Sequence, residues 1–279
     1  MKKMQVLFIV GPTASGKTSL ALQLARSSNG EIISADSRQI YRVMDIGTGK
    51  EVSDDVVHHL IDIKNPDEEY TLSHFLSDAK KAISDIVAKG KLPIVVGGTG
   101  LYVQALVENW NVPDVQPDEE YRDALESKST AELSDMLGQI DPLHAKELGG
   151  GRRYLIRALE LHNATGKKPS ELKKKSEPLY DALVLGVDMP RQELYKRIDD
   201  RVDKMFEDGL QEEVAGLLKK YPSDLKAFKT IGYQEFIDGK GDEKQRIKYA
   251  THAYARRQQT WLKRMSYIKW LDDTVMAQK

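Results

Sequence analysis

The stretch GPTASGKT, Gly11 to Thr18, decides the fold of this 279-residue chain. It fits the pattern G-x-x-x-x-G-K-[S/T], a loop whose backbone amides bind phosphate groups. Gly11 and Gly16 let backbone N–H groups approach a phosphate, and a helix beginning near Thr18 favours an anion at its N-terminus. Lys17 adds a point charge for the outer phosphoryl oxygens. The alternative is a glycine turn without a ligand, and nothing in the loop itself selects a nucleoside.

Apolar runs and amphipathic segments alternate on both sides of this loop. Residues 5–10 are typical of a buried parallel strand, and residues 18–28 of the helix that follows it. Further strands are predicted at 31–36, 92–98, 181–189 and, as a short last one, 267–273. Further helices are predicted at 37–42, 71–90, 101–107, 191–209, 209–220 and 242–265. Strands separated by helices predict an α/β fold, with a P-loop NTPase-like parallel sheet flanked by helices.

Residues 111–120 are rich in proline and aspartate, which indicates a domain boundary. Residues 121–176 that follow have an entirely helical pattern and end in a basic segment. We therefore expect a catalytic core made of residues 1–113 and 181–279, whose C-terminal region is helical. Residues 114–180 are expected to form an all-helical insertion domain.

Composition limits the function classes. With 40% hydrophobic residues and a mean hydropathy of −0.51, the chain can bury a core. It has no cysteine, which excludes a disulfide framework, a thiolate zinc site and a cysteine nucleophile, and favours a reducing cytoplasm. The apolar run at residues 4–10 is too short for a membrane helix, so no membrane association is expected. The net charge of −1 means that nucleic-acid binding would depend on local basic patches.

Two such patches exist, at residues 151–175 and 243–270. Each carries eight Lys or Arg residues, against two acidic residues in the first and one in the second. A charge run is usually a solvated helix face. Aromatic residues interleave with these cations, and they can stack on bases while the cations hold phosphates. They are Tyr154, Tyr249, Tyr254 and Trp261.

The carboxyl ends of the predicted strands locate the chemistry, because ligands of open parallel sheets bind there. The phosphate loop, Asp36 and Thr99 of the segment GGTG each follow a strand. Asp36 has three open interpretations: a general base, a magnesium ligand through water, or an N-cap of helix 37–42. Thr99 would donate to a substrate oxygen or cap helix 101–107. The adjacent histidines of HHLID, residues 58–62, favour structural roles over metal binding, because neighbours on a strand face opposite ways.

Several segments, in their order, resemble the tRNA dimethylallyltransferases, the bacterial tRNA isopentenyltransferase family. The resemblance covers almost the whole chain, and SADSRQIY with GGTGLY is far more specific than the loop alone. The matching segments are GPTASGKT, EIISADSRQIYRVMDIGT, HHLIDI, GKLPIVVGGTGLYVQALV, RYLIRALELHNATGK, ELYKRIDDRVDKM, IGYQEF and YARRQQTWLKR. Kinases of small metabolites share the loop but lack those two specific segments.

The resemblance implies that the loop binds the diphosphate of dimethylallyl diphosphate, a leaving group. The acceptor would be N6 of the adenosine on the 3′ side of the anticodon, with Asp36 as the base. The other catalytic residues would be Lys17, Thr99 and Arg201, and Thr18 would ligate Mg²⁺. The diphosphate site would comprise Gly11, Thr13, Ala14, Ser15, Gly16, Lys17 and Thr18.

The resemblance also implies that the tRNA anticodon stem-loop is the partner and that the target base is flipped out. The residues that match tRNA-contacting positions are Asp36, Ser37, Arg38, Gln39, Thr99, Arg122, Arg153, Arg157, Gly232, Tyr233, Arg256, Arg257, Gln258 and Trp261. In RRYLIR the arginine pair is shifted by one residue from the family pattern, which leaves the contacts of Arg152 and Arg153 open. A cytoplasmic monomer is expected. The competing hypotheses are a P-loop kinase that uses ATP and a non-catalytic RNA-binding module.

Overall fold

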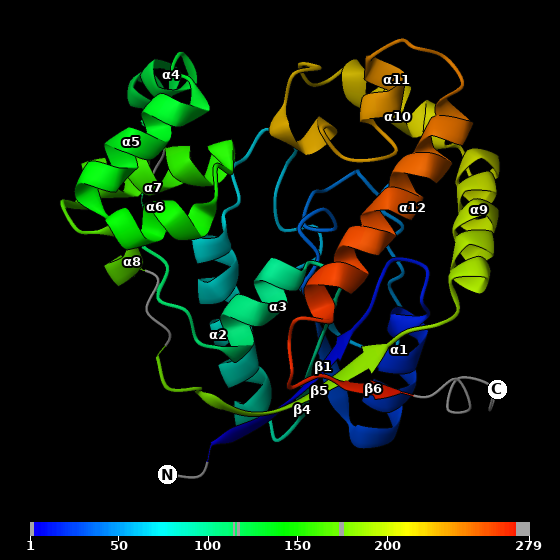
Figure 1. Ribbon diagram of the computed structural model, residues 1–279. Helices are drawn as coiled ribbons and strands as arrows, with labels where there is room; N and C mark the ends of the chain where they lie inside the picture. The colour runs from blue at the N-terminus through cyan, green and yellow to red at the C-terminus, as the bar shows by residue number, and fades with distance from the viewer. Residues whose placement is uncertain (1–2, 114, 116–117, 173–175, 272–279) are drawn as a thin grey trace. The chain divides into compact units, whose positions relative to one another are not determined.

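The computed structural model describes residues 3–113, 115, 118–172 and 176–271 (Figure 1). Its strands form one parallel sheet of order β3-β2-β4-β1-β5-β6. They are β1 Met4–Val10, β2 Gly30–Ser34, β3 His58–His59, β4 Leu92–Gly97, β5 Tyr180–Val187 and β6 Lys269–Leu271. The predicted P-loop-like parallel α/β fold is confirmed.

The central strand β1 places the phosphate loop. Its neighbours are β4, with Ile9 opposite Val96, and β5, with Ile9 opposite Leu185. Phe8, Ile9 and Val10 are fully buried, because a parallel sheet covered on both faces needs continuous apolar runs. The loop that follows Val10 therefore starts from the middle of the sheet.

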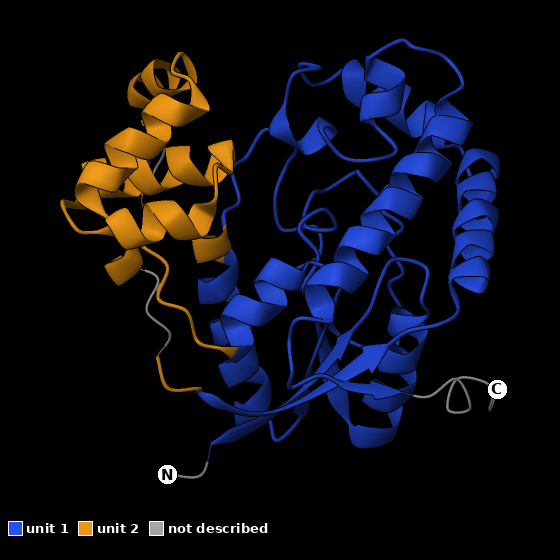
Figure 2. Cartoon of the chain, viewed as in Figure 1, with its two compact units in different colours: residues 1–71, 75–107, 179–279 blue, residues 72–74, 108–178 orange. Residues whose placement is uncertain are grey.

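Contacts divide the chain into two compact units (Figure 2). One unit comprises residues 1–71, 75–107 and 179–279, and the other residues 72–74 and 108–178. The described helices of the first are α1 Lys17–Ser28, α2 Leu72–Ala88 (apart from its first three residues), α3 Gly100–Val107, α9 Arg191–Glu207, α10 Leu210–Leu218, the 3-10 helix Lys226–Phe228, α11 Gln234–Ile237 and α12 Glu243–Leu262. The predicted boundaries at 114 and 180 stay a prediction, and residue 114 lies outside the described residues.

The second unit is built from short helices. They are α4 Glu119–Glu126, α5 Thr130–Ile140, α6 Pro142–Leu148, α7 Arg152–Thr165 and α8 Pro169–Leu172. Leu133, Leu137 and Leu155 form its fully buried centre. A capping box at Ser129 and Glu132 starts α5. Lys173 to Lys175, in the basic segment, lie outside the described residues, as do residues 272–273 of the predicted last strand.

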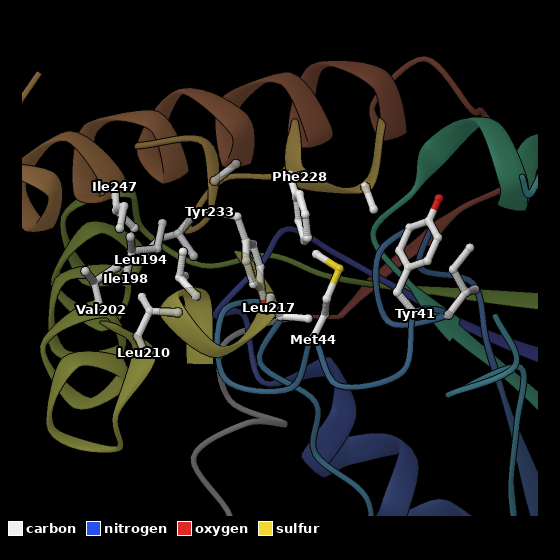
Figure 3. Close-up of a cluster of buried hydrophobic side chains, with 14 residues drawn as sticks. Tyr41, Met44, Leu194, Ile198, Val202, Leu210, Leu217, Phe228, Tyr233 and Ile247 are labelled. Atoms are coloured by element: carbon white, nitrogen blue, oxygen red, sulfur yellow. The ribbon is translucent and has the colours of Figure 1, made fainter. Parts of the chain in front are cut away.

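A separate apolar cluster joins the C-terminal helices of the first unit to the segment after β2 (Figure 3). Tyr233, Phe228, Leu217 and Met44 point toward one another in it. Helix α12 also packs against α9 and α3. The helices that follow β5 are thereby fixed against the loops at the strand ends.

The prediction of a helix at residues 37–42 is wrong. The segment forms turns, and Tyr41 makes an isolated parallel bridge with Lys64. The Asp36 carboxylate accepts a hydrogen bond from the Arg38 amide at 2.8 Å, a local turn that competes with a helix. Asp36 is therefore not the N-cap of a helix. Among the described residues, no helix is long and apolar enough to cross a membrane.

Glu31 of β2 is a buried carboxylate that receives three cationic side chains. His59 Nε2 lies 2.7 Å away, Lys91 Nζ 2.9 Å and Lys89 Nζ 3.2 Å from its oxygens. Burial alone would raise the pKa of Glu31, but the hydrogen bonds from these groups outweigh burial and lower the pKa to about 2. One histidine of the HHLID segment is thus used inside the protein.

Replacing Glu31 tests this arrangement. A depressed carboxylate pKa contributes stability above the ordinary pKa of 4.5, and this is lost as the pH falls toward 2. We expect Glu31→Gln to lower the free energy of unfolding at pH 7 by roughly 2 kcal/mol. Urea unfolding between pH 7 and pH 3 should show this deficit shrinking below about pH 5. The exposed Glu120→Gln is the control, and a pH-independent deficit would contradict the account.

Candidate functional site

The loop Gly11–Gly16 connects β1 to α1 and opens the N-terminus of that helix. Ala14 and Gly16 have φ angles of 62° and 85°, in the left-handed region. Gly16 is the N-cap residue and offers no side chain to the first-turn amides, and that turn contains no acidic residue. The free N–H groups and the helix dipole therefore favour an anion. Holding Ala14 left-handed costs about 1 kcal/mol, a strain typical of ligand-binding loops.

Lys17 places a positive charge inside the loop. Its ammonium group donates to the Pro12 carbonyl at 3.2 Å. Burial, followed by the neighbouring charge of Arg201, lowers the pKa of Lys17 to about 8, while Asp36 and Glu51 act in the opposite direction. A bound anion would remove much of this penalty.

Arg201 of α9 reaches the same loop. Its Nη1 donates to Thr13 Oγ1 at 3.0 Å, and its Nη2 lies 3.3 and 3.4 Å from the carbonyl oxygens of Thr48 and Gly49. Burial lowers the pKa of Arg201 too, with Glu51 and Asp36 opposing. The two cations predicted to hold a diphosphate are therefore brought together, with Asp36 close enough to act on both.

Thr99 and Asp36 end neighbouring strands, as predicted. The Ser37 amide donates to Thr99 Oγ1 at 3.2 Å, whereas the Thr99 carbonyl accepts from the first turn of α3. The Thr99 hydroxyl thus bonds the backbone beside Asp36, and at the start of α3 it is the Thr99 carbonyl that accepts hydrogen bonds. Ser15, also predicted in the loop, is fully buried, and its hydroxyl has no hydrogen-bond partner among the described residues.

Two predicted base- or tRNA-contacting glutamines are used internally. Gln39 accepts from the Ser34 hydroxyl at 3.2 Å and donates to the Gly49 carbonyl at 3.3 Å. Gln258 of α12 accepts from the Thr13 amide at 2.9 Å and donates to the Gly98 carbonyl at 3.0 Å. Gln258 therefore connects the phosphate loop to the end of β4, and the RNA contacts of both glutamines stay predictions.

The remaining predicted residues of α12 lie around Gln258. Arg256 and Arg257 are exposed; Arg256 donates to the Tyr195 hydroxyl at 2.6 Å, and Arg257 lies over the ring of Tyr254. Trp261 Nε1 donates to Gln104 Oε1 at 3.2 Å. One face of this helix thus supports the loop, while another presents cations to solvent.

Gly232 and Tyr233, also predicted to contact tRNA, are buried. The Tyr233 ring is fully enclosed, and its hydroxyl donates to Glu213 at 2.7 Å. Tyr233 therefore supports the protein interior. Its predicted tRNA contact is untested.

In the second unit, Arg122 and Arg157 share one buried carboxylate. Arg122 makes two hydrogen bonds to Glu160, at 2.7 and 2.9 Å, and Arg157 Nη1 lies 3.4 Å from the same carboxylate. Arg153, by contrast, is exposed. The group of Arg122, Arg157 and Glu160 therefore has a net charge of about +1. The hydrogen bonds to Glu160 fix the orientation of the two arginine side chains.

Three residues near the site escaped the sequence analysis as site residues. Glu51 acts electrostatically on Lys17 and Arg201. Tyr254 has its pKa raised to about 12 by burial and by Asp36, and a hydrogen bond with Thr99 opposes this rise. Glu213 binds a loop described below. Of the three, only Tyr254 could have been found from the sequence, because it precedes Gln258 by four residues and so lies on the same face of the helix.

The role of Thr18 as a magnesium ligand stays a prediction. Among the described residues, no cluster of three or more His, Cys, Asp or Glu side chains could hold a metal. Thr18 is half-buried in the first turn of α1, beside the anion-binding amides. Mg²⁺ at phosphate sites needs few protein ligands, because phosphate and water oxygens complete its shell.

Comparison with known proteins gives matches over nearly the whole chain. The family model described as IPP transferase matches residues 39–265, and that described as Isopentenyl transferase matches residues 4–60. A tRNA dimethylallyltransferase of Thermomicrobium roseum is 45% identical over 288 residues, covering 98% of this chain and 88% of that protein. Another, of Anoxybacillus flavithermus, is 42% identical over 97% of this chain and 91% of that protein.

Solved structures are similar over the same length. The full-length tRNA isopentenylpyrophosphate transferase of Bacillus halodurans is 39% identical, with a TM-score of 0.72, over 97% of this chain and 90% of that chain. A eukaryotic dimethylallyltransferase acting on tRNA is 32% identical, with a TM-score of 0.85, over 99% of this chain and 75% of that chain.

The desolvated charge of Lys17 should lower the free energy of unfolding of the ligand-free protein. Its pKa of about 8 lies below the ordinary 10.5, so the cost is full below pH 8 and fades as the pH rises toward 10.5. We expect Lys17→Met to raise the free energy of unfolding at pH 7 by roughly 1–2 kcal/mol, with a smaller gain at pH 10. Chemical unfolding at both pH values measures this, with the exposed Lys219→Met as control. A Lys17→Met protein less stable at pH 7 would refute it.

Proposed function

Because this chain belongs to the IPP transferase family and transfers a dimethylallyl group to tRNA, we propose the following roles for its residues. The loop Gly11–Thr18 binds the diphosphate of dimethylallyl diphosphate, and Asp36 accepts the proton of the attacking amine. The acceptor is N6 of the adenosine on the 3′ side of the anticodon. The observation that carries the assignment is the geometry at the strand ends, where Arg201 bonds Thr13 of the loop and the turn of Asp36 is joined to Thr99 through the Ser37 amide. The kinase alternative is not favoured, because the relatives are tRNA prenyltransferases.

The donor half of the reaction is a bond cleavage that leaves charge on the diphosphate. The allylic C–O bond breaks, and its electron pair remains on the leaving oxygen. Lys17, Arg201 and the free amides at the start of α1 stabilise that charge, which is usually the largest contribution to such catalysis. Thr13 orients Arg201, and the hydroxyl of Thr99 is proposed to contact the bridging oxygen.

The acceptor half forms the N6–C bond. The exocyclic amine of adenine is a weak nucleophile, since its lone pair is delocalised into the ring. Asp36 takes the N6 proton as the bond forms, as a general base. The turn with the Arg38 amide, at 2.8 Å, holds the carboxylate in place while leaving its other oxygen for the substrate. The Asp36–Gln39 segment receives the flipped base.

Magnesium belongs to the proposal as a bound partner of the diphosphate. Thr18 would hold it together with phosphate oxygens, and it would neutralise part of the leaving-group charge. Lys17 and Arg201 bind the remaining charge directly.

Exposed cations are proposed to hold the anticodon stem-loop. Arg256 and Arg257 on α12 and Arg153 in the second unit are exposed and suited to phosphate contacts. Arg122 and Arg157 together carry one positive charge more than Glu160 neutralises, and this charge is proposed to attract the tRNA backbone. The proposal includes a cytoplasmic location, where unmodified tRNA is available, and a monomeric enzyme.

The decisive variant for this function is Asp36→Asn, which keeps the turn but cannot accept the proton. With dimethylallyl diphosphate, unmodified tRNA, Mg²⁺ and no ATP, we expect the wild type to label the tRNA. Asp36→Asn should lower the single-turnover transfer rate by about 10²–10⁴-fold. The exposed Asp67→Asn is the control. Transfer that requires ATP would favour the kinase, and absence of any transfer would favour an RNA-binding module.

Arg257 tests the tRNA surface. If it contacts a phosphate, Arg257→Ala should weaken tRNA binding about fivefold and by the same factor for different tRNA sequences. The slope of log Kd against log salt should fall by about 0.7–0.9, which filter binding at several salt concentrations measures. An unchanged slope would remove Arg257 from the interface. Lys219→Ala, an exposed cation outside both basic patches, serves as control.

A further inference from the structure

A carboxylate remote from the reacting groups holds the segment Asp45–Gly49, here called the 45–49 segment. Glu213 of α10 accepts hydrogen bonds from three successive amides, those of Asp45, Ile46 and Gly47, at 2.9, 2.8 and 3.1 Å. It also accepts the Tyr233 hydroxyl at 2.7 Å. The Glu213 carboxylate therefore accepts four hydrogen bonds from protein groups, which fix its position and that of the segment.

The other end of the 45–49 segment faces the site. The Thr48 and Gly49 carbonyls lie 3.3 and 3.4 Å from Nη2 of Arg201. The same two carbonyls accept from the Gln39 amide, at 3.5 and 3.3 Å. The 45–49 segment therefore contacts both the Arg201 guanidinium and the Gln39 side-chain amide.

The contact with Arg201 is close enough to dictate the residue type. Gly49 has a φ of +59°, and a Cβ added there would lie 1.6 Å from Nη2 of Arg201. Glycine is thus required both for the turn and for the close approach of the guanidinium to the backbone. Ile46 of the segment packs against the apolar cluster that contains Met44, Phe228 and Tyr233 (Figure 3).

We infer that Glu213 is a positioning residue, which sets the Arg201 guanidinium and the Gln39 amide through the 45–49 segment. The inference rests on the proposed function, because it assumes that Arg201 binds the diphosphate. Without Glu213, three amides lose their acceptor and the segment can shift. Small displacements are costly in catalysis, since a misplacement of about 1 Å can lower a rate about 10²-fold.

The variants separate positioning from stability. Glu213→Ala should lower kcat/KM for dimethylallyl diphosphate by about 10–100-fold, whereas Glu213→Gln, which keeps an acceptor oxygen, should lose about 3–10-fold. Tyr233→Phe removes one donor and keeps the ring in place, so its loss should resemble that of Glu213→Gln. Glu212→Gln, on the same helix but exposed, is the matched control and should retain full activity. Full activity of a folded Glu213→Ala would overturn the inference.

A double-mutant cycle distinguishes positioning of Arg201 by Glu213 from a role of Glu213 in stability alone. It compares the effect of Glu213→Ala on the single-turnover rate with and without Arg201. If Glu213 acts through Arg201, Glu213→Ala should cost less than about threefold in single-turnover rate once Arg201 is alanine. An equal cost in both backgrounds would overturn the inference and assign Glu213 to the fold alone. If Arg201→Ala itself left activity intact, the proposed role of Arg201 would fail, and this inference with it. Thermal unfolding of each variant identifies any that do not fold.

Discussion

The site depends on keeping Lys17 of the phosphate loop and Arg201 of α9 together. Burial lowers the pKa of both groups, and the neighbouring charge of Arg201 lowers the pKa of Lys17 further. Asp36 and Glu51 offset only part of this cost. A site that concentrates positive charge at the expense of stability is suited to a multiply charged anion, and a diphosphate leaving group is such an anion.

Contacts from distant parts of the chain keep this charged loop in place. Gln258 of α12 bonds the Thr13 amide, and Arg201 of α9 bonds the Thr13 hydroxyl. The 45–49 segment in turn holds Arg201, and Glu213 of α10 holds that segment. Because α12 packs on α9, bonds the loop through Gln258 and exposes Arg256 and Arg257, one helix links the surface proposed for tRNA to the loop proposed to bind the donor (Figure 1).

Much of this could be predicted from the sequence. The loop, the strands and Lys17 follow from local patterns, the strand ends singled out Asp36, and the resemblance to the family added the role of Asp36 and the candidate Arg201. What local patterns could not give were contacts between residues far apart in the chain. The resemblance placed Gln258 among the tRNA-contacting positions, and no local pattern indicated that its side-chain amide also bonds the loop more than 200 residues earlier. The wrong helix at 37–42 has a local cause, because Asp36 makes a turn with the Arg38 amide that the periodicity of apolar residues does not reveal.

The central claim is that the loop holds the diphosphate of a prenyl donor beside Asp36. Calorimetric titration of the Asp36→Asn protein, with an anticodon stem-loop RNA present, measures this without turnover. The account predicts that dimethylallyl diphosphate binds, that inorganic diphosphate competes with it, and that Lys17→Met in this background abolishes binding. Saturable binding of ATP that dimethylallyl diphosphate cannot displace would contradict it, and would make the loop a nucleotide site.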